Sequence, residues 1–100
     1  MSPAMRRRLR DLGEDLRTAR RRRRIAQADL AGRMGVSVGT VKRMEAGDPG
    51  VAIGTIAMCL LALGKIERLS GLLPEEADDI GLMVDRQSLP QRIRRKGVGR

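Results

Sequence analysis

Arginine and lysine side chains dominate the chemistry that this sequence can perform. Its 100 residues include 21 Lys and Arg against 12 Asp and Glu, no His and no aromatic residue. Without histidine there is no base for a catalytic triad and no imidazole ligand for a metal, and the single cysteine, Cys59, cannot form a zinc cluster or an internal disulfide. Lysine or carboxylate catalysis stays open, but no pattern marks it. We therefore expect no enzyme, no metal and no cofactor.

The positive charge is concentrated at the two ends of the chain. Residues 1–48 hold 13 Lys and Arg against 6 Asp and Glu, residues 49–85 hold 2 against 6, and residues 86–100 hold 6 against none. This distribution indicates that the basic first half faces a polyanion, while the acidic middle and the basic tail meet other partners.

The segment 27–47 predicts two short helices joined by a tight turn. The apolar faces of the two helices are formed by Leu30, Ala31 and Met34 and by Val38, Val41 and Met44. Gly35 interrupts the first pattern, and Ser37 can cap the second helix. Two helices that meet at a sharp turn form a helix-turn-helix, whose second helix fits the major groove of DNA.

The whole chain predicts an all-α fold. Apolar spacing indicates helices at about residues 5–23, 27–34, 38–46, 55–63 and 66–72, then an amphipathic helix at about 76–87 and a basic tail. Residues 1–5 are expected to fray. The predicted domains are a DNA-binding domain over residues 1–73 and a dimerisation or partner segment with a flexible tail over residues 74–100.

The core is expected to be aliphatic, since the chain has no aromatic residue. The side chains expected to face inward outside the central helix pair are Leu9, Leu12, Leu16, Ala19, Ile56, Ala57, Leu60, Leu61, Ile66, Leu69 and Leu73. Ile53 is expected to cover the start of the fourth helix as a hydrophobic staple.

The first helix is expected to end in an unusual way, in the arginine run 20–24. A glycine in the left-handed conformation commonly follows a helix, so a positive φ at Arg24 would cost about 1 kcal/mol relative to glycine. The run can contact phosphates, or it can be a solvated face that the helix dipole favours. Both interpretations stay open.

The sequence also predicts a cytoplasmic protein that does not enter a membrane. No apolar run approaches the roughly 18 residues of a membrane span. A lone thiol suits a reducing compartment, and residues 1–10 are too charged for the apolar part of a signal peptide.

Ten positions of the segment 27–47 resemble, in register, the signature of the XRE family, the Cro and lambda-repressor type of helix-turn-helix regulators. They are Gln27, Leu30, Ala31, Gly35, Val36, Ser37, Thr40, Val41, Glu45 and Gly47. The resemblance covers about residues 9–73. It implies a five-helix lambda-repressor-like domain that dimerises and binds double-stranded DNA.

The resemblance also implies roles for individual residues. The positions implied to contact DNA are Gln27, Ser37, Val38, Gly39, Thr40, Lys42 and Arg43. Arg43 is the best candidate for base contact, because a guanidinium can bond guanine O6 and N7 together, which is worth about 1 to 3 kcal/mol of discrimination. Val38 could touch a thymine methyl group, and Gln27 and Thr40 would hold phosphates. Gly39 departs from the family's usual polar residue, which indicates either close backbone approach to DNA or low specificity.

Two charged residues match a structural pair of the family. The resemblance implies that Arg20 and Glu45 tie the first helix to the third; two separately solvated charges are the alternative.

A second likeness concerns the end of the chain. The region 71–96 is similar to the C-terminal part of HipB-like regulators, which implies an antitoxin that represses its own operon and pairs with a HipA-like kinase toxin. The alternatives are a stand-alone or phage-type repressor, a nonspecific basic nucleic-acid-binding protein and an interaction module that no longer binds DNA. A homodimer would use the predicted helices 66–72 and 76–87.

Overall fold

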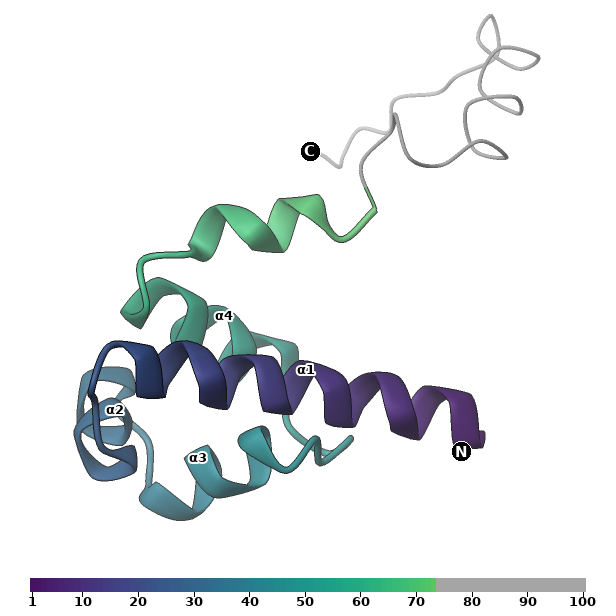
Figure 1. The fold of residues 1–100 in the computed structure, drawn as a ribbon, viewed down its shortest axis with the longest axis horizontal. Helices are drawn as coiled ribbons and strands as arrows, with labels where there is room; N and C mark the ends of the chain where they lie inside the picture. The colour runs from purple at the N-terminus through teal and green to yellow at the C-terminus, as the bar shows by residue number, and fades with distance from the viewer. Residues whose placement is uncertain (74–100) are drawn as a thin grey trace, which may run out of the picture. The chain divides into compact units, whose positions relative to one another are not determined.

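The computed structural model describes residues 1–73. All regular secondary-structure elements in this part of the chain are helices. The elements are α1 (Pro3–Arg22), α2 (Gln27–Met34), α3 (Val38–Glu45), α4 (Ile53–Ala62) and the 3₁₀ helix η1 (Ile66–Gly71) (Figure 1). Residues 1–69 form one compact unit. The predicted helix 76–87 and the basic tail lie outside the described residues. No helix within residues 1–73 is long and apolar enough to cross a membrane.

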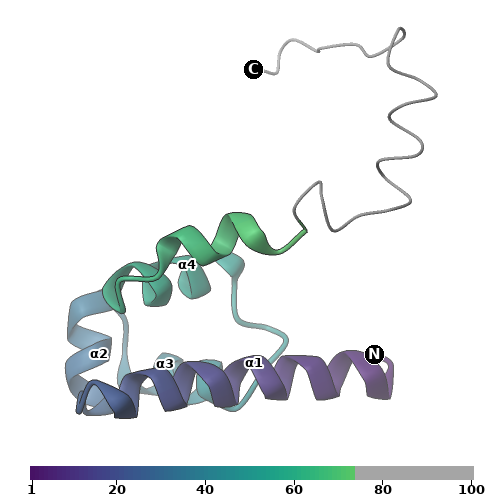
Figure 2. The ribbon, with the colours of Figure 1, turned by 45° about the horizontal axis from the view of Figure 1, so that its top comes forward.

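The helices of this unit pack around α3 and α2. α3 contacts both α1 and α2, and α2 also contacts α4. Figures 1 and 2 both show that the long α1 continues past α3 toward its own N-terminus. The core is aliphatic, as expected, and its buried members are Leu16, Ile25, Leu30, Ala31, Met34, Val41, Met44, Cys59 and Leu63.

The boundaries of α2 match the prediction, and those of α1 and α3 lie within two residues of it. The expectation that residues 1–5 fray is wrong, because α1 begins at Pro3. Ser2 caps this helix: its hydroxyl accepts a hydrogen bond from the amide of Met5 at 3.2 Å. Proline favours the first helical turn, where its missing N–H has no partner to lose.

Several side chains predicted to face inward are exposed. They are Leu12 (40% exposed), Leu61 (64%), Ile66 (40%) and Leu73 (71%), and the predicted staple Ile53 is 67% exposed. α4 is apolar around most of its circumference, so spacing alone could not select the face that carries the buried Cys59 over the face of Leu61. η1 is a 3₁₀ helix with three residues per turn, so the α-helical spacing assumed for Ile66 does not apply, and Leu73 lies beyond the end of η1.

All four α-helices within residues 1–73 end in the same backbone turn. The left-handed position of the turn is filled by Arg24 (φ 55°), Gly35 (φ 72°), Gly47 (φ 79°) and Gly64 (φ 75°). After α1 the turn is closed by the amide of Ile25, which donates to the carbonyl of Arg20 at 3.3 Å. Arg24 thus adopts the positive φ considered above, at a position where glycine would carry no steric penalty.

α1 and the end of α3 approach each other at two glycines. A Cβ atom added to Gly13 would lie 2.5 Å from the carbonyl oxygen of Glu45, and one added to Gly47 would lie 2.7 Å from the Cα of Arg10. Both distances are far below van der Waals contact. The two backbones therefore touch directly, and this contact sets the position of α1 beside α3.

Replacing Arg24 by glycine should stabilise the protein. Arg24→Gly is expected to raise the free energy of unfolding by about 1 kcal/mol, since it removes the left-handed strain. The control Arg22→Gly, at the last residue of α1, should bring no such gain, because its backbone is already helical and glycine is a poor helix former. Urea unfolding measures both, and equal destabilisation by the two variants would contradict the role of Arg24's backbone.

Two Gly→Ala variants should change stability in opposite directions. Gly13→Ala is expected to lower the free energy of unfolding by about 1 to 3 kcal/mol, because its Cβ overlaps backbone atoms that cannot rotate away. Gly32→Ala, in α2, meets no atom within 4 Å and should raise it by about 0.5 to 1 kcal/mol. A stabilised Gly13→Ala variant in thermal or urea unfolding would show that α1 and α3 do not touch.

Candidate nucleic-acid interface

The outer face of α3 carries most of the residues predicted to contact DNA. Val41, Met44 and Glu45 are buried, whereas the side facing away from the core exposes Ser37, Val38, Gly39, Lys42 and Arg43. The helix starts at a capped end: the hydroxyl of Ser37 accepts a hydrogen bond from the amide of Thr40 at 3.2 Å. The sequence predicted this cap. The Ser37 hydroxyl is therefore already engaged by the backbone of its own helix.

Arg43 lies along this outer face rather than extending straight from it. Its Nη2 donates to the Thr40 hydroxyl at 3.2 Å. Its Nη1 lies 3.6 Å from the point where a Cβ of Gly39 would be. A Cβ atom at position 39 would thus be in ordinary van der Waals contact with the guanidinium, which places Arg43 directly beside Gly39. The remaining N–H groups of Arg43 stay available for an external acceptor.

Arg20 and Glu45, which the family resemblance pairs, are joined by two hydrogen bonds. Arg20 Nε donates to Glu45 Oε2 at 2.6 Å, and Nη2 donates to Oε1 at 3.1 Å. Their side chains are only 10% and 4% exposed. Arg20 Nη1 also donates to the carbonyl of Ile25 at 2.7 Å, so this arginine holds the turn between α1 and α2 as well.

Gln27, predicted to hold a phosphate, takes part in the same network. Its side-chain amide donates to Glu45 Oε1 at 3.0 Å, and the residue is half-buried. The structure thus gives Gln27 a positioning role that sequence reasoning missed. No buried side-chain nitrogen or oxygen within residues 1–73 lacks a hydrogen-bond partner.

Cys59 is buried in the core, and its thiol is in an environment that makes it unreactive. Burial and, to a smaller extent, the negative charge of Glu45 together raise the pKa of its thiol to about 11. At neutral pH the group is a protonated thiol, which is a poor nucleophile. Within residues 1–73 no group of His, Cys, Asp and Glu could hold a metal ion.

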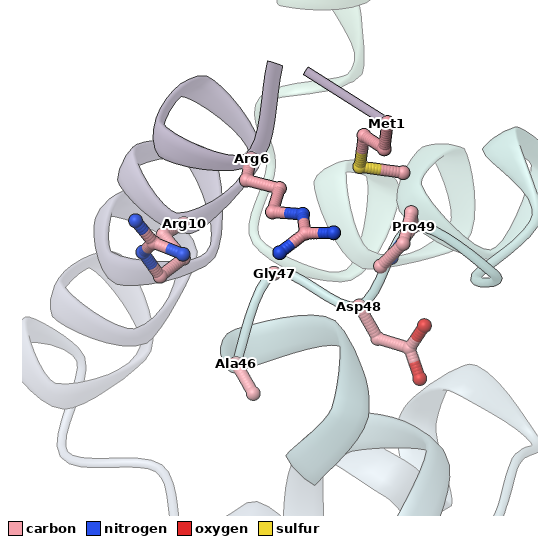
Figure 3. Close-up of a pocket in the computed structure, with 7 residues that line it drawn as sticks. All are labelled: Met1, Arg6, Arg10, Ala46, Gly47, Asp48 and Pro49. Carbon is pink, nitrogen blue, oxygen red and sulfur yellow. The ribbon is translucent and has the colours of Figure 1, made fainter. Parts of the chain in front are cut away.

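Arginines of α1 extend the positive surface beside α3. A hollow of about 290 Å³ is lined by Arg17, Gln27, Lys42, Glu45 and Ala46. A second hollow of about 390 Å³ is lined by Met1, Arg6, Arg10, Ala46, Gly47, Asp48 and Pro49 (Figure 3). Sequence reasoning did not single out Arg6, Arg10 or Arg17, although their spacing puts them on the helix face of Gly13.

The arginine run at the end of α1 is exposed from Arg21 to Arg24. Arg23 Nη1 donates to the carbonyl of Ala19 at 2.8 Å, so this side chain folds back on the last turn of its own helix. That contact fits the dipole-favoured interpretation for Arg23.

The family described as a helix-turn-helix domain matches residues 11–69. The chain belongs to this helix-turn-helix family. No curated protein and no solved structure matches the chain. In the helix-turn-helix domain, α2 and α3 form the motif, and the second helix of such a motif enters the major groove of DNA. The match supports an XRE-like regulator that binds DNA.

Removing one member of the buried pair should cost far more than removing an exposed charge. Glu45→Ala leaves the Arg20 guanidinium buried without its carboxylate, so the free energy of unfolding should fall by about 3 to 5 kcal/mol. The control is Asp11→Ala, which breaks the pair of Arg8 and Asp11, at 3.8 Å and with side chains 87% and 67% exposed. It should cost less than about 1 kcal/mol in the same urea titration. Similar losses in the two variants would mean that Arg20 and Glu45 are solvated separately.

Proposed function

We propose that this protein is a sequence-specific, double-stranded DNA-binding transcriptional repressor. The observation that carries the proposal is the outer face of α3, where Arg43 and Lys42 are exposed while the opposite face is fixed by the buried Arg20 and Glu45. A basic helix held rigidly with one face free has what is needed to enter a major groove. Occupying a promoter in this way blocks transcription.

The proposed contacts divide between bases and phosphates. Arg43 offers a planar fork of N–H donors to guanine, and Val38, 36% exposed, offers methyl groups to thymine. Lys42 and the remaining donors of Gln27 and Thr40 are suited to phosphates, which set position rather than sequence. The charge of the chain then accelerates encounter with DNA.

We also propose that the repressor acts as a homodimer on a palindromic operator. α4 exposes Ile53, Met58 and Leu61, with exposed fractions of 67%, 39% and 64%. Apolar side chains gathered on one short helix favour burial against another surface. A second copy of the chain meets this need and supplies the second recognition helix that a palindrome requires.

The narrower form of the proposal is an antitoxin that represses a HipBA-like operon and binds a HipA-like kinase. Its support is the sequence of residues 71–96, most of which lies outside the described residues. A gene for a HipA-like kinase beside this one would favour the antitoxin over a stand-alone or phage-type repressor. Either regulator would act in the cytoplasm.

Selection of bound sites from random duplexes tests this function directly. The wild-type chain should enrich a palindrome whose half-sites lie about 34 to 36 Å apart, one turn of the DNA helix. Arg43→Ala should weaken binding to the enriched site by about 1 to 3 kcal/mol and relax preference at one base pair of each half-site.

The matched control is Arg68→Ala, which removes the same charge from η1. It should leave the base preference unchanged. Enrichment of no sequence, or an equal loss of affinity for all duplexes in Arg43→Ala, would favour the nonspecific nucleic-acid-binding alternative instead.

A further inference from the structure

The start of α1 lies outside the matched helix-turn-helix domain. The family match begins at residue 11, whereas α1 begins at Pro3. The added turns carry Arg6, Arg7, Arg8 and Arg10 and no acidic residue. A frayed basic tail would need no explanation, but this segment is a capped helix in a fixed place.

Backbone packing holds this added segment against the end of α3. A Cβ on Gly47 would lie 2.7 Å from both the carbonyl oxygen of Leu9 and the Cα of Arg10. Because this contact is made by backbone atoms, it fixes the position of the segment independently of the conformations of its side chains. Arg6 and Arg10, one helical turn apart, consequently lie on the side of α1 that borders the residues after α3.

These two arginines line the hollow of about 390 Å³ together with Ala46, Gly47 and Asp48. Figure 3 shows Arg6 reaching across the hollow toward Gly47 and Asp48, with Arg10 on its α1 side. Within residues 1–73 neither guanidinium has a hydrogen bond or an ion pair. Asp48 is the single acidic residue of the lining, and its Oδ1 already accepts the amide of Gly50 at 2.7 Å. The guanidinium donors of Arg6 and Arg10 thus remain unpaired at this hollow within the described part of the chain.

The hollow continues the positive face of α3. Ala46, which is exposed, lines this hollow and also the one beside it, where Arg17 and Lys42 meet. From Arg6 to Arg17 the rise along α1 is about 16 Å. That length corresponds to about five base pairs of duplex DNA. A basic edge therefore runs from Lys42 along α1 through Arg17, Arg10 and Arg6.

We propose that Arg6 and Arg10 form a second phosphate-binding edge, which binds the DNA backbone beside the groove that α3 enters. This inference rests on the proposed function and extends it, since these residues precede the family domain. The ligand is the phosphate backbone of duplex DNA, and the contacts add affinity without sequence preference. The competing role is structural: the two arginines would stabilise Asp48 and the C-terminal carbonyls of α3.

Charge-matched double variants of the full chain separate these roles. Arg6→Gln with Arg10→Gln removes the edge; Arg7→Gln with Arg8→Gln removes the same charge from other faces of the same turns. Binding to a mixed-sequence duplex and to the duplex enriched by the wild type is measured by fluorescence anisotropy at several salt concentrations. Thermal unfolding of each variant is measured alongside.

The edge variant should bind both duplexes about tenfold or more weakly at 0.1 M salt, and its slope of log K against log salt should be smaller by about two. The control variant should lose no more than a few fold, and base preference should not change. Equal losses in the two double variants would overturn the inference, as would a lower melting temperature of the edge variant with unchanged DNA binding. If the wild type binds neither duplex, the proposed function itself fails, an outcome distinct from the other two.

Discussion

The arrangement of α1, α2 and α3 depends on one buried carboxylate. Glu45 is the last residue of α3, and it accepts hydrogen bonds from Arg20 of α1 and Gln27 of α2. Arg20 in turn bonds the carbonyl of Ile25 between the first two helices. A buried charge pair contributes little net stability when its desolvation is included, but it is directional, and an apolar contact is not. The orientation of the helix-turn-helix motif is therefore fixed by hydrogen-bond geometry.

The composition of the core explains why such directional contacts matter here. The nine buried apolar residues within residues 1–73 include no aromatic ring. Several of them are small or flexible, such as Ala31 and Met34. Between α1 and α3 the packing is of backbone on backbone, at Gly13 and Gly47. The close approach shortens the distance that Arg20 must span to reach Glu45. Glycine contact and charge pair thus support each other.

Much of the motif could be predicted from the sequence, because its signals are local. The Ser37 cap, the Gly35 stop and the apolar faces of the two helices each involve residues a few positions apart. The face of α4 was not predictable in this way, because apolar residues surround that helix and its buried face, at Cys59 and not at Leu61, depends on packing against other helices such as α2. The same limit applies to the candidate site. The candidate residues of α3 were implied by the family resemblance, which rests on a local signature, whereas the position of Arg6 and Arg10 beside Gly47 depends on how two distant segments cross.

The position of Arg43 beside Gly39 has a consequence for the chemistry of the outer face of α3. A Cβ atom at position 39 would be in van der Waals contact with Arg43 Nη1 at 3.6 Å and with the Ser37 hydroxyl at 3.7 Å. A side chain at this position would therefore touch both the guanidinium and the helix cap, while the network around Glu45 lies on the buried face. Position 39 thus links the orientation of Arg43 to the start of its own helix.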